Sequence, residues 1–403
     1  MPVAIGTHGA SANAEASPLR RVALAEGPAG RSFAFDAHRR IALDRFLADV
    51  RSVAAGLPEA ACAINLCEDR YRFLVAFCAV ALRGQINLLP PSRAPTAIED
   101  VRRQYPDSYC VSDIELSPAP PRLHALPEPL STLHEHALEE HALEEHALDG
   151  RIPEVDADAI AMIGFTSGST GTPKANPKTW ASLRISTAQN VAALRHLWPD
   201  TDAAGDSILP VVATVPPQHM YGMELSVLLP LLAPVAVHGD RPFFPEDVAS
   251  ALAHADAPAL LVTTPVHLRA LVESGIALPP LAGVVTATAP LPQALAAAAE
   301  QRFGCEVREM FGATEICIVA HRRTAHEDAW RAYPGVHLHP QPDGTLVEAP
   351  HLPAPVALAD LVELRADNTF VLCGRQSDLL EIAGKRASLG DLTRRLQSVP
   401  GVI

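Results

Sequence analysis

The sequence lacks several features that would assign it to common classes of protein. It has no excess of basic side chains, because 32 Lys and Arg stand against 46 Asp and Glu among 403 residues, a net charge of −14. That balance argues against a nucleic-acid-binding surface. The seven cysteines are scattered, odd in number and without a Cys-x-x-Cys pair. This pattern argues against a disulfide framework or a zinc site, and it favours core positions in a reducing compartment.

Long apolar runs are also absent. The longest, around residues 73–82 and 225–237, are too short or interrupted by proline to span a bilayer. Residues 1–18 hold no apolar segment of the secretory type. We therefore expect a cytoplasmic protein without a membrane span, and its length suggests two or three subdomains.

The chain does contain a stretch rich in hydroxyls and glycine that ends in a lysine. It follows a short apolar run, residues 160–165, which predicts a buried strand. The stretch itself is Thr166-Ser167-Gly168-Ser169-Thr170-Gly171-Thr172-Pro173-Lys174. It predicts a loop whose backbone N–H groups and hydroxyls bind phosphate oxygens, with glycines that allow close backbone approach. The order differs from that of a P-loop, so a Walker-type nucleotidase is not indicated, and a surface loop without a ligand is the alternative.

Short apolar runs alternate with helical patterns along most of the chain. Helices are predicted over 43–57, 71–83, 180–197, 266–274 and 293–303, and strands over 62–66, 208–215, 259–263 and 284–287. Such alternation predicts an α/β fold with parallel sheets and helices on their faces. The proline-rich segment 335–373, with its Asp343-Gly344 turn, predicts a small antiparallel β subdomain.

The same patterns suggest where the chain divides. We predict a first αβ subdomain over 1–160 with a surface insertion near 117–150, a second over 161–334 that carries the phosphate loop, a small β subdomain over 335–374, and a hinge with the start of a further lobe over 375–403. The insertion repeats His-Ala-Leu-Glu-Glu from His136 and His141. A five-residue period turns each copy by about 140° on a helix, which disfavours a metal-binding histidine face.

The hydroxyl-rich stretch resembles the phosphate-binding signature of the adenylate-forming (AMP-binding) superfamily, which includes acyl- and aryl-CoA synthetases. Three further segments resemble motifs of that superfamily in order and spacing: Met310-Phe311-Gly312-Ala313-Thr314-Glu315, then Asp360, then the hinge segment 374–378 followed by Gly384-Lys385-Arg386. The resemblance implies the large N-terminal lobe of these enzymes, with two parallel-sheet αβ subdomains and a small β subdomain. The residues given end at Ile403, before the point where the family carries its catalytic lysine, so we expect most of the C-terminal lobe to lie outside them.

The resemblance also implies ATP and Mg²⁺ as cofactors. Glu315 is the candidate metal ligand, because Mg²⁺ prefers hard oxygen donors and takes one or two carboxylates plus substrate phosphates. The hydroxyl of Thr314 is expected to donate to the α-phosphate. The implied catalytic residues are Thr166, Lys174, Thr314 and Glu315. The implied ATP- or AMP-binding residues are Thr166, Ser167, Gly168, Ser169, Thr170, Gly171, Lys174, Phe311, Gly312, Thr314, Asp360 and Arg375.

Three of these residues also have simpler interpretations. Phe311 offers a flat face for adenine, although core packing is the commoner role of such a residue. Asp360 can accept both ribose hydroxyls, and Arg375 can donate to ribose and phosphate oxygens together. The alternatives are an ordinary loop aspartate and a surface ion pair of small value.

The implied acyl pocket draws on two further segments and on the motif that contains Thr314. It comprises His219, Tyr221, Thr286, Ala287, Thr288, Ala289 and Ala313. The chain departs from the family in two places, since Ala175 follows the loop lysine where glycine is usual and Ser377 replaces the hinge aspartate. The second departure puts the usual domain rotation in doubt.

Segments 65–71, 177–180 and 382–386 are similar to the short aryl-acid ligases of aryl polyene and xanthomonadin pigment clusters. This narrower resemblance implies adenylation of a hydroxybenzoate-type acid and transfer to the phosphopantetheine thiol of an acyl carrier protein. An aryl- or fatty-acyl-CoA synthetase is one alternative, and a nucleotide- or acyl-binding module without catalysis is another. Because the segment with the catalytic lysine lies beyond Ile403, these 403 residues alone are expected to bind ATP but to adenylate slowly.

Overall fold

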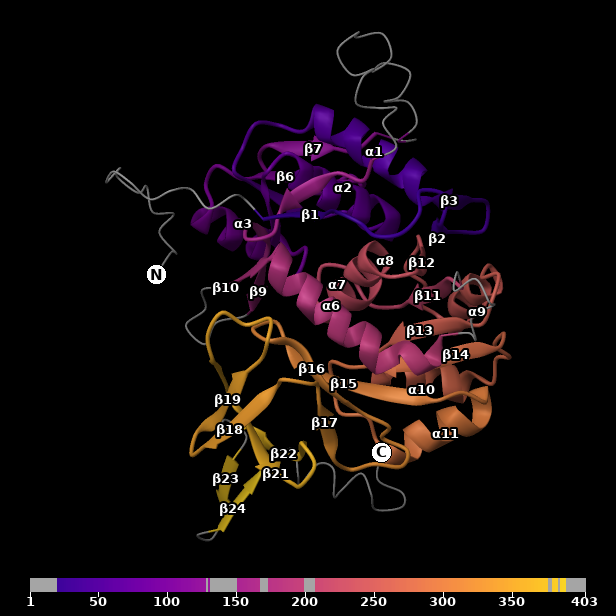
Figure 1. Ribbon diagram of the computed structural model, residues 1–403, viewed down its shortest axis with the longest axis vertical. Coiled ribbons are helices and arrows are strands. Elements are labelled where there is room, and N and C mark those ends of the chain that lie inside the picture. Colours follow the sequence, from indigo (N-terminus) through magenta and orange to yellow (C-terminus); the bar gives the residue numbers. More distant parts are fainter. Residues whose placement is uncertain are drawn as a thin grey trace. The chain divides into compact units, whose positions relative to one another are not determined.

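The computed structural model describes residues 20–127, 130, 151–166, 173–198, 207–375, 379–382 and 385–388, the last two ranges as backbone (Figure 1). The chain divides into two compact units. Unit 1 comprises residues 1–25, 47–68 and 73–181, and unit 2 comprises residues 26–46, 69–72 and 182–403. The histidine repeat lies outside the described residues.

Unit 1 is built on a six-stranded sheet in the order β10-β9-β5-β4-β6-β7. Its parallel strands are β4 (Cys62–Asn65), β5 (Ile86–Leu89), β6 (Tyr109–Ser112), β7 (Leu123–Ala125) and β9 (Ile160–Thr166). β10 (Lys174–Thr179) runs antiparallel to β9. Helix α3 (Pro95–Gln104) buries Ile98 and Val101 against the sheet. A separate antiparallel pair joins β1 (Arg21–Ala23) to β8 (Glu154–Asp156).

Three predicted helices are confirmed within a few residues. They are α1 (Leu43–Gly56), α2 (Arg70–Leu82) and α6 (Trp180–Leu194), the last continuing as a 3₁₀ turn, η1 (Arg195–Leu197). Helix α2 is apolar around nearly its whole circumference, which is the pattern of a helix buried on all sides.

Unit 2 is built on an eleven-stranded sheet in the order β21-β22-β17-β16-β15-β14-β13-β11-β12-β2-β3. The parallel strands are β2 (Ser32–Phe35), β11 (Leu209–Ala213), β12 (Val235–His238), β13 (Ala259–Thr263), β14 (Leu281–Thr286) and β15 (Val307–Ala313). The antiparallel strands are β3 (Arg40–Ala42), β16 (Cys317–Arg322), β17 (Trp330–Ala332), β21 (Asp360–Leu364) and β22 (Thr369–Arg375).

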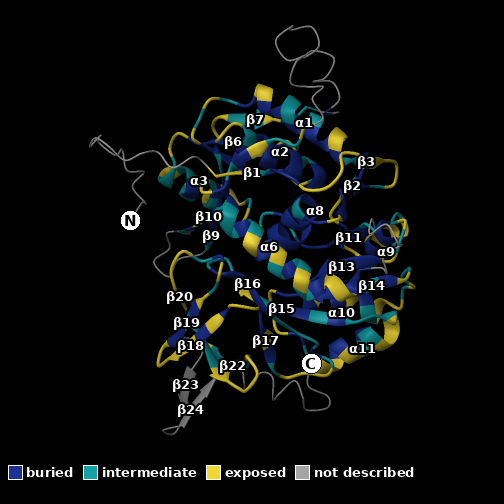
Figure 2. Ribbon diagram, in the orientation of Figure 1, coloured by how far each residue is buried: buried dark blue, intermediate teal, exposed yellow. Residues whose placement is uncertain are grey.

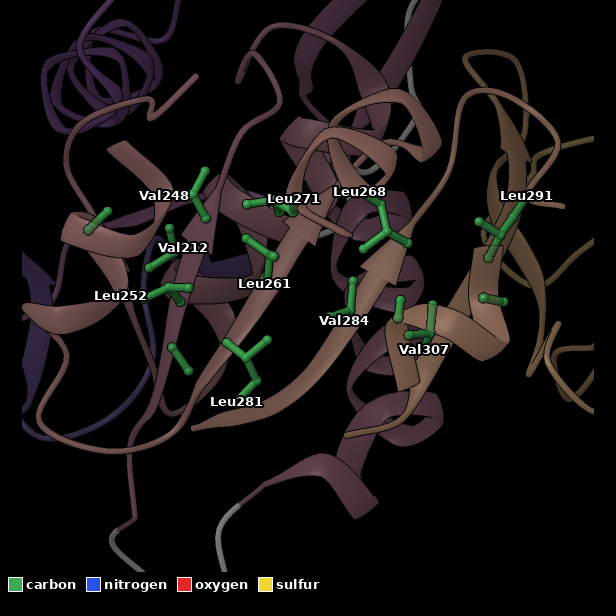
Figure 3. Packing of buried hydrophobic residues seen from close by; sticks show 14 of the residues in the cluster. Val212, Val248, Leu252, Leu261, Leu268, Leu271, Leu281, Val284, Leu291 and Val307 are labelled. Carbon is green, nitrogen blue, oxygen red and sulfur yellow. The ribbon is translucent and has the colours of Figure 1, made fainter. Parts of the chain in front are cut away.

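One face of the parallel strands is covered by α9 (Pro245–Ala253), α10 (Pro265–Ser274) and α11 (Gln293–Phe303). Alternate strand residues, among them Leu261 and Val284, pack against these helices (Figure 3). The central parallel strands β11, β12, β13 and β14 are dark blue along almost their whole length in Figure 2, which reflects burial on both faces. This core confirms the α/β prediction.

The segment predicted as a small β subdomain contributes to two sheets. β18 (His337–Gln341), β19 (Gly344–Glu348) and β20 (Val356–Leu358) form an antiparallel sheet of their own. β21 and β22 instead continue the large sheet, because β22 pairs with β17. Beyond them, β23 (Leu379–Ile382) pairs with β24 (Lys385–Ser388). Among the described residues, no helix combines the length and apolar character needed to cross a membrane.

Candidate functional site

The predicted phosphate loop joins the two strands of a hairpin in unit 1. β9 and β10 pair antiparallel, and Thr166 lies opposite Lys174 in the register. The hairpin therefore brings the first and last predicted residues of the loop together. Lys174 is exposed. Ser167, Gly168, Ser169, Thr170 and Gly171 lie outside the described residues.

Two amide side chains that sequence reasoning missed support the base of this hairpin. The buried Asn176 Nδ2 donates to Lys174 O at 3.1 Å and lies 3.4 Å from Thr166 Oγ1. Gln104 Nε2 donates to Pro173 O at 3.0 Å. Asn176 lies in the segment that departs from the family pattern after the lysine, and that departure was the available signal.

The second predicted segment forms a tight turn in unit 2. Thr314 and Glu315 occupy its centre, and the turn is closed by a hydrogen bond from Ile316 N–H to Ala313 O at 3.1 Å. Gly312 is required because a Cβ atom there would lie 2.3 Å from Cys317 O on the facing strand. Both central residues are half-buried, so the turn presents a hydroxyl and a carboxylate at the end of β15.

Phe311 lies in an aromatic cluster rather than alone. Its ring centroid is 5.5 Å from that of Trp330 and 5.7 Å from that of Phe370. These are edge or tilted contacts of the kind that aromatic pairs prefer. The contacts support the packing role, and an adenine contact on the half-buried ring stays a prediction.

Asp360 and Arg375 lie opposite each other where β21 begins and β22 ends. Arg375 Nε donates to Asp360 Oδ1 at 3.1 Å, and the side-chain exposures are 58% and 19%. A pair this exposed stabilises the fold little. The hydrogen bond does hold the two side chains that are candidates for ribose binding next to each other. Ser377 lies outside the described residues.

His219 and Tyr221 follow β11. His219 is the exposed N-cap of α7 (Met220–Met223), which continues as a π-helical segment, η2 (Glu224–Leu228), and then as α8 (Leu229–Leu232). Gly222 is required there because a Cβ atom would lie 2.0 Å from Pro216 O. The buried Tyr221 hydroxyl donates to Val285 O at 2.8 Å, and burial raises the pKa of this tyrosine.

A buried arginine holds the start of this loop. Arg70 Nη2 donates to Ala213 O at 2.8 Å and to Val215 O at 3.0 Å, and Nη1 donates to Ser226 Oγ on η2. The side chain is fully buried. Burial, with the nearby charge of Arg241, lowers its pKa to about 9, so the guanidinium remains charged at neutral pH. Arg70 therefore fixes both the end of β11 and the helix that follows His219.

The segment after β14 combines burial with backbone strain. Thr286 is fully buried, and its hydroxyl has no hydrogen-bond partner among the residues that the structure describes. Ala287 is buried, whereas Thr288 and Ala289 are exposed. Thr288 has a φ of 78°, a left-handed conformation that is rare for a β-branched residue. Such strain is concentrated at functional sites.

The sheet brings these unit 2 segments to one edge. His219 and Tyr221 follow β11, Thr286 to Ala289 end or follow β14, and Ala313 to Glu315 end or follow β15. β15, β14, β13 and β11 are successive neighbours in the sheet and run parallel. Their carboxyl ends therefore lie at the same edge, where open α/β sheets bind ligands.

Residues 12–345 match the model of a family described as AMP-binding enzyme. A 4-coumarate–CoA ligase of Rhodobacter capsulatus is 33% identical over 242 residues, 59% of this chain and 57% of the relative. One of Halorhodospira halophila is 30% identical over 254 residues, 62% of this chain and 60% of the relative. The matches therefore span less than two thirds of these relatives.

Solved structures show the same fold. The o-succinylbenzoate CoA synthetase (MenE) of Bacillus subtilis, in complex with its acyl-adenylate intermediate, aligns with a TM-score of 0.69 at 16% identity, covering 92% of this chain and 80% of that chain. ATP-bound MatB of Rhodopseudomonas palustris aligns with a TM-score of 0.70 at 17% identity, covering 93% and 81%. At these identities the likeness shows the α/β fold.

Proposed function

Because this chain belongs to the AMP-binding enzyme family, we propose that the full-length protein adenylates a hydroxybenzoate-type aryl carboxylic acid with ATP. Pyrophosphate is released, and the acyl group then passes to the phosphopantetheine thiol of an acyl carrier protein. The observation that supports the proposal is that candidate residues gather at the carboxyl ends of the parallel strands in the unit 2 sheet. There the Thr314–Glu315 turn and the loops after β14 and β11 follow three strands of the parallel run β15-β14-β13-β11.

The first step joins two anions. An oxygen of the carboxylate bonds to the α-phosphorus of ATP, and the bond from that phosphorus to the pyrophosphate oxygen breaks. Fixed donors and cations must offset the repulsion and align the attack. We assign this role to Lys174, with the hydroxyls of Thr166 and Thr314 as donors. Asp360 and Arg375 hold the ribose. In the second step, a thiolate attacks the acyl carbon and AMP leaves.

Glu315 is our candidate to hold Mg²⁺, which would supply positive charge on the phosphate oxygens. The described residues contain no cluster of three or more Asp, Glu, His or Cys side chains arranged around a metal. A single half-buried carboxylate fits Mg²⁺ bound chiefly through substrate phosphates, rather than a cage made of protein ligands.

The residues at the pocket edge favour a small polar ring over an alkyl chain. His219 and Thr288 are exposed in the segments that follow β11 and β14, and Thr286 has a buried hydroxyl. Polar groups buried against an alkyl chain without a partner cost about 1–3 kcal/mol each. The two relatives with 4-coumarate in their names act on an acid that carries a hydroxylated ring.

The same two names favour a second candidate for the acceptor, which is CoA itself. Carrier protein and CoA present the same phosphopantetheine thiol, so the chemistry of the second step is identical. The two hypotheses differ only in what is attached to the phosphate end of that arm.

ATP–pyrophosphate exchange by the full-length protein tests the first step. We expect faster exchange with 3- or 4-hydroxybenzoate or 4-coumarate than with dodecanoate. Faster exchange with dodecanoate would replace the aryl assignment with a fatty-acyl one, and nucleotide binding without exchange would indicate a binding module. Mass spectrometry of reactions that contain CoA or a phosphopantetheinylated carrier protein then identifies the acceptor.

A further inference from the structure

A buried carboxylate lies behind the turn that carries Thr314 and Glu315. Glu224, the first residue of η2, is fully buried. Its Oε2 accepts a hydrogen bond from Ile318 N–H at 2.9 Å. Ile318 is the residue opposite Gly312 in the β15–β16 pair. Glu224 therefore holds the strand that returns from the turn.

The other carboxylate oxygen is anchored on α6. Oε1 accepts from Ser186 Oγ at 2.5 Å and from Asn190 Nδ2 at 3.0 Å. Asn190 Oδ1 in turn accepts from the Tyr333 hydroxyl at 2.9 Å. Burial, with the charge of Glu224, raises the pKa of this tyrosine well above its ordinary value, so it remains a donor. These donors fix the orientation of the carboxylate, as a buried charge requires.

A second buried side chain, His351, contacts the backbone of the same turn. His351 Nε2 lies 2.7 Å from Ile316 O, and since a carbonyl only accepts, this nitrogen carries the proton. Between Ile316 and Ile318 lies Cys317, whose φ of 60° is left-handed. That conformation costs about 1–2 kcal/mol in a residue with a Cβ. It persists where the surroundings determine the backbone on both sides, as Glu224 and His351 do here.

Glu224 also belongs to the helical segment that carries Tyr221, three residues earlier in the chain. We propose that Glu224 is a positioning residue, which holds the Thr314–Glu315 turn in a fixed place relative to the loop of His219 and Tyr221. Its kinetic consequence rests on the proposed function. Its structural consequence, protection of the Ile318 amide, does not.

The test is Glu224→Gln in the full-length protein. The amide keeps the size of the side chain but cannot accept from Ile318 while it also accepts from Ser186 and Asn190. We expect kcat for pyrophosphate exchange to fall about 10- to 100-fold, because small misplacements of reacting groups have effects of that size. We expect KM for ATP to change less than about threefold, and the Mg²⁺ concentration for half-maximal rate to rise. The Ile318 amide should exchange hydrogen faster.

The matched control is Thr187→Val. Thr187 lies next to Ser186 on α6, is equally buried, and donates its hydroxyl to Leu183 O rather than to Glu224. It should leave kcat and the Ile318 amide unchanged. Should Glu224→Gln not fold, Tyr333→Phe provides a milder test, because it removes only the hydrogen bond to Asn190. Its expected effects have the same direction and are smaller.

Unchanged kcat, Mg²⁺ dependence and Ile318 protection in a folded variant would overturn the proposal. Equal changes in Thr187→Val would also overturn it, because the effect would then be general loosening of α6. If the wild-type protein exchanges no pyrophosphate with any acid, the proposed function fails. The Ile318 amide still decides whether Glu224 positions the turn.

Discussion

Two segments of this chain are predicted to face the phosphates, and they are supported in different ways. The hairpin of unit 1 is held at its base by neutral amides, with Asn176 and Gln104 donating over 3.0–3.4 Å to groups at Thr166, Pro173 and Lys174. The turn of unit 2 is held by close backbone contact at Gly312 and by buried side chains. The first support is uncharged and includes a residue of the hairpin itself, Asn176, whereas the second includes a buried carboxylate 94 residues from the strand that it holds.

This difference predicts different responses to mutation. Neutral hydrogen bonds hold the base of the hairpin in unit 1, so changes there should affect phosphate binding and leave unit 2 intact. The turn is part of the unit 2 sheet, so changes around it should affect catalysis and folding together unless they are confined to its tip.

Glu315→Gln at the tip should give the largest effect. The substitution keeps the size of the side chain and removes the negative charge that we propose binds Mg²⁺. Lost charge stabilisation of this kind is typically worth about 2.7–4 kcal/mol, or two to three orders of magnitude in rate. Pyrophosphate exchange should fall by that factor while the melting temperature stays within a few degrees. The exposed Glu363→Gln is the control, and near-normal exchange by Glu315→Gln would remove Glu315 from the metal role.

The strand that returns from the turn should make stability sensitive to acid. Burial, with the adjacent Arg308, lowers the pKa of His321 on β16 from 6.5 to about 4. Because the folded state favours the neutral imidazole, the contribution is complete above pH 6.5 and is lost as the pH falls towards 4. The loss can reach about 3 kcal/mol. Urea unfolding between pH 7 and 4 measures it.

His321→Asn should flatten that dependence, whereas substitution of the exposed His337 should not. An equally steep loss in His321→Asn would assign the effect to other groups. Glu300 and Glu306 also have lowered pKa values, since hydrogen bonds from arginine and histidine outweigh burial. Their contribution to stability is complete above the ordinary glutamate pKa of 4.5 and is lost as the pH falls below it, so it overlaps the His321 effect only at the acid end of the range.

Asn176→Ala should test the local support with a smaller effect. It removes the amide that joins the two ends of the hairpin, and the loss of neutral hydrogen bonds is worth about 0.5–1.5 kcal/mol each. We expect KM for ATP to rise about tenfold with little change in the pH dependence of unfolding. Gln85→Ala is a control elsewhere in unit 1, since Gln85 donates to Pro58 O. An unchanged KM would show that the loop holds its shape without Asn176.

The strands and helices of the core could be predicted because their pattern is local. The helix at α11 (Gln293–Phe303) and the strand at β13 (Ala259–Thr263) have the predicted bounds. Pairing partners could not be predicted from that pattern. Nothing in residues 335–373 indicates that β22 pairs with β17 in the large sheet, because periodicity shows a strand but not its neighbour.

The candidate site shows the same limit. The Thr314–Glu315 turn was visible as a motif, and so was the departure at Ala175, next to Asn176. Glu224 was not, since it lies 94 residues from Ile318 in an apolar stretch where nothing local indicates a partner. The left-handed backbone at Thr288 was also hidden, because a β-branched residue is among the last that sequence rules place there.

Thr288→Gly should give the smallest effect. It tests what backbone strain contributes where no buried side chain among the described residues holds the strained residue. Cys317 is strained and held by buried side chains, whereas Thr288 is strained and exposed. Glycine relieves about 1–2 kcal/mol of left-handed strain and loses about 0.5–1 kcal/mol in backbone entropy. We therefore expect a gain of about 0.5–1 kcal/mol in the free energy of unfolding. The loop should become less ordered, so KM for the aryl acid should rise a few-fold while KM for ATP stays constant.

The control is Asp367→Gly, at a φ of 59° in the β21–β22 turn, which should change neither KM. If Thr288→Gly is less stable than the wild type, the hydroxyl or methyl group of Thr288 makes contacts that outweigh the strain. The left-handed conformation of Thr288 would then serve folding rather than the acyl site.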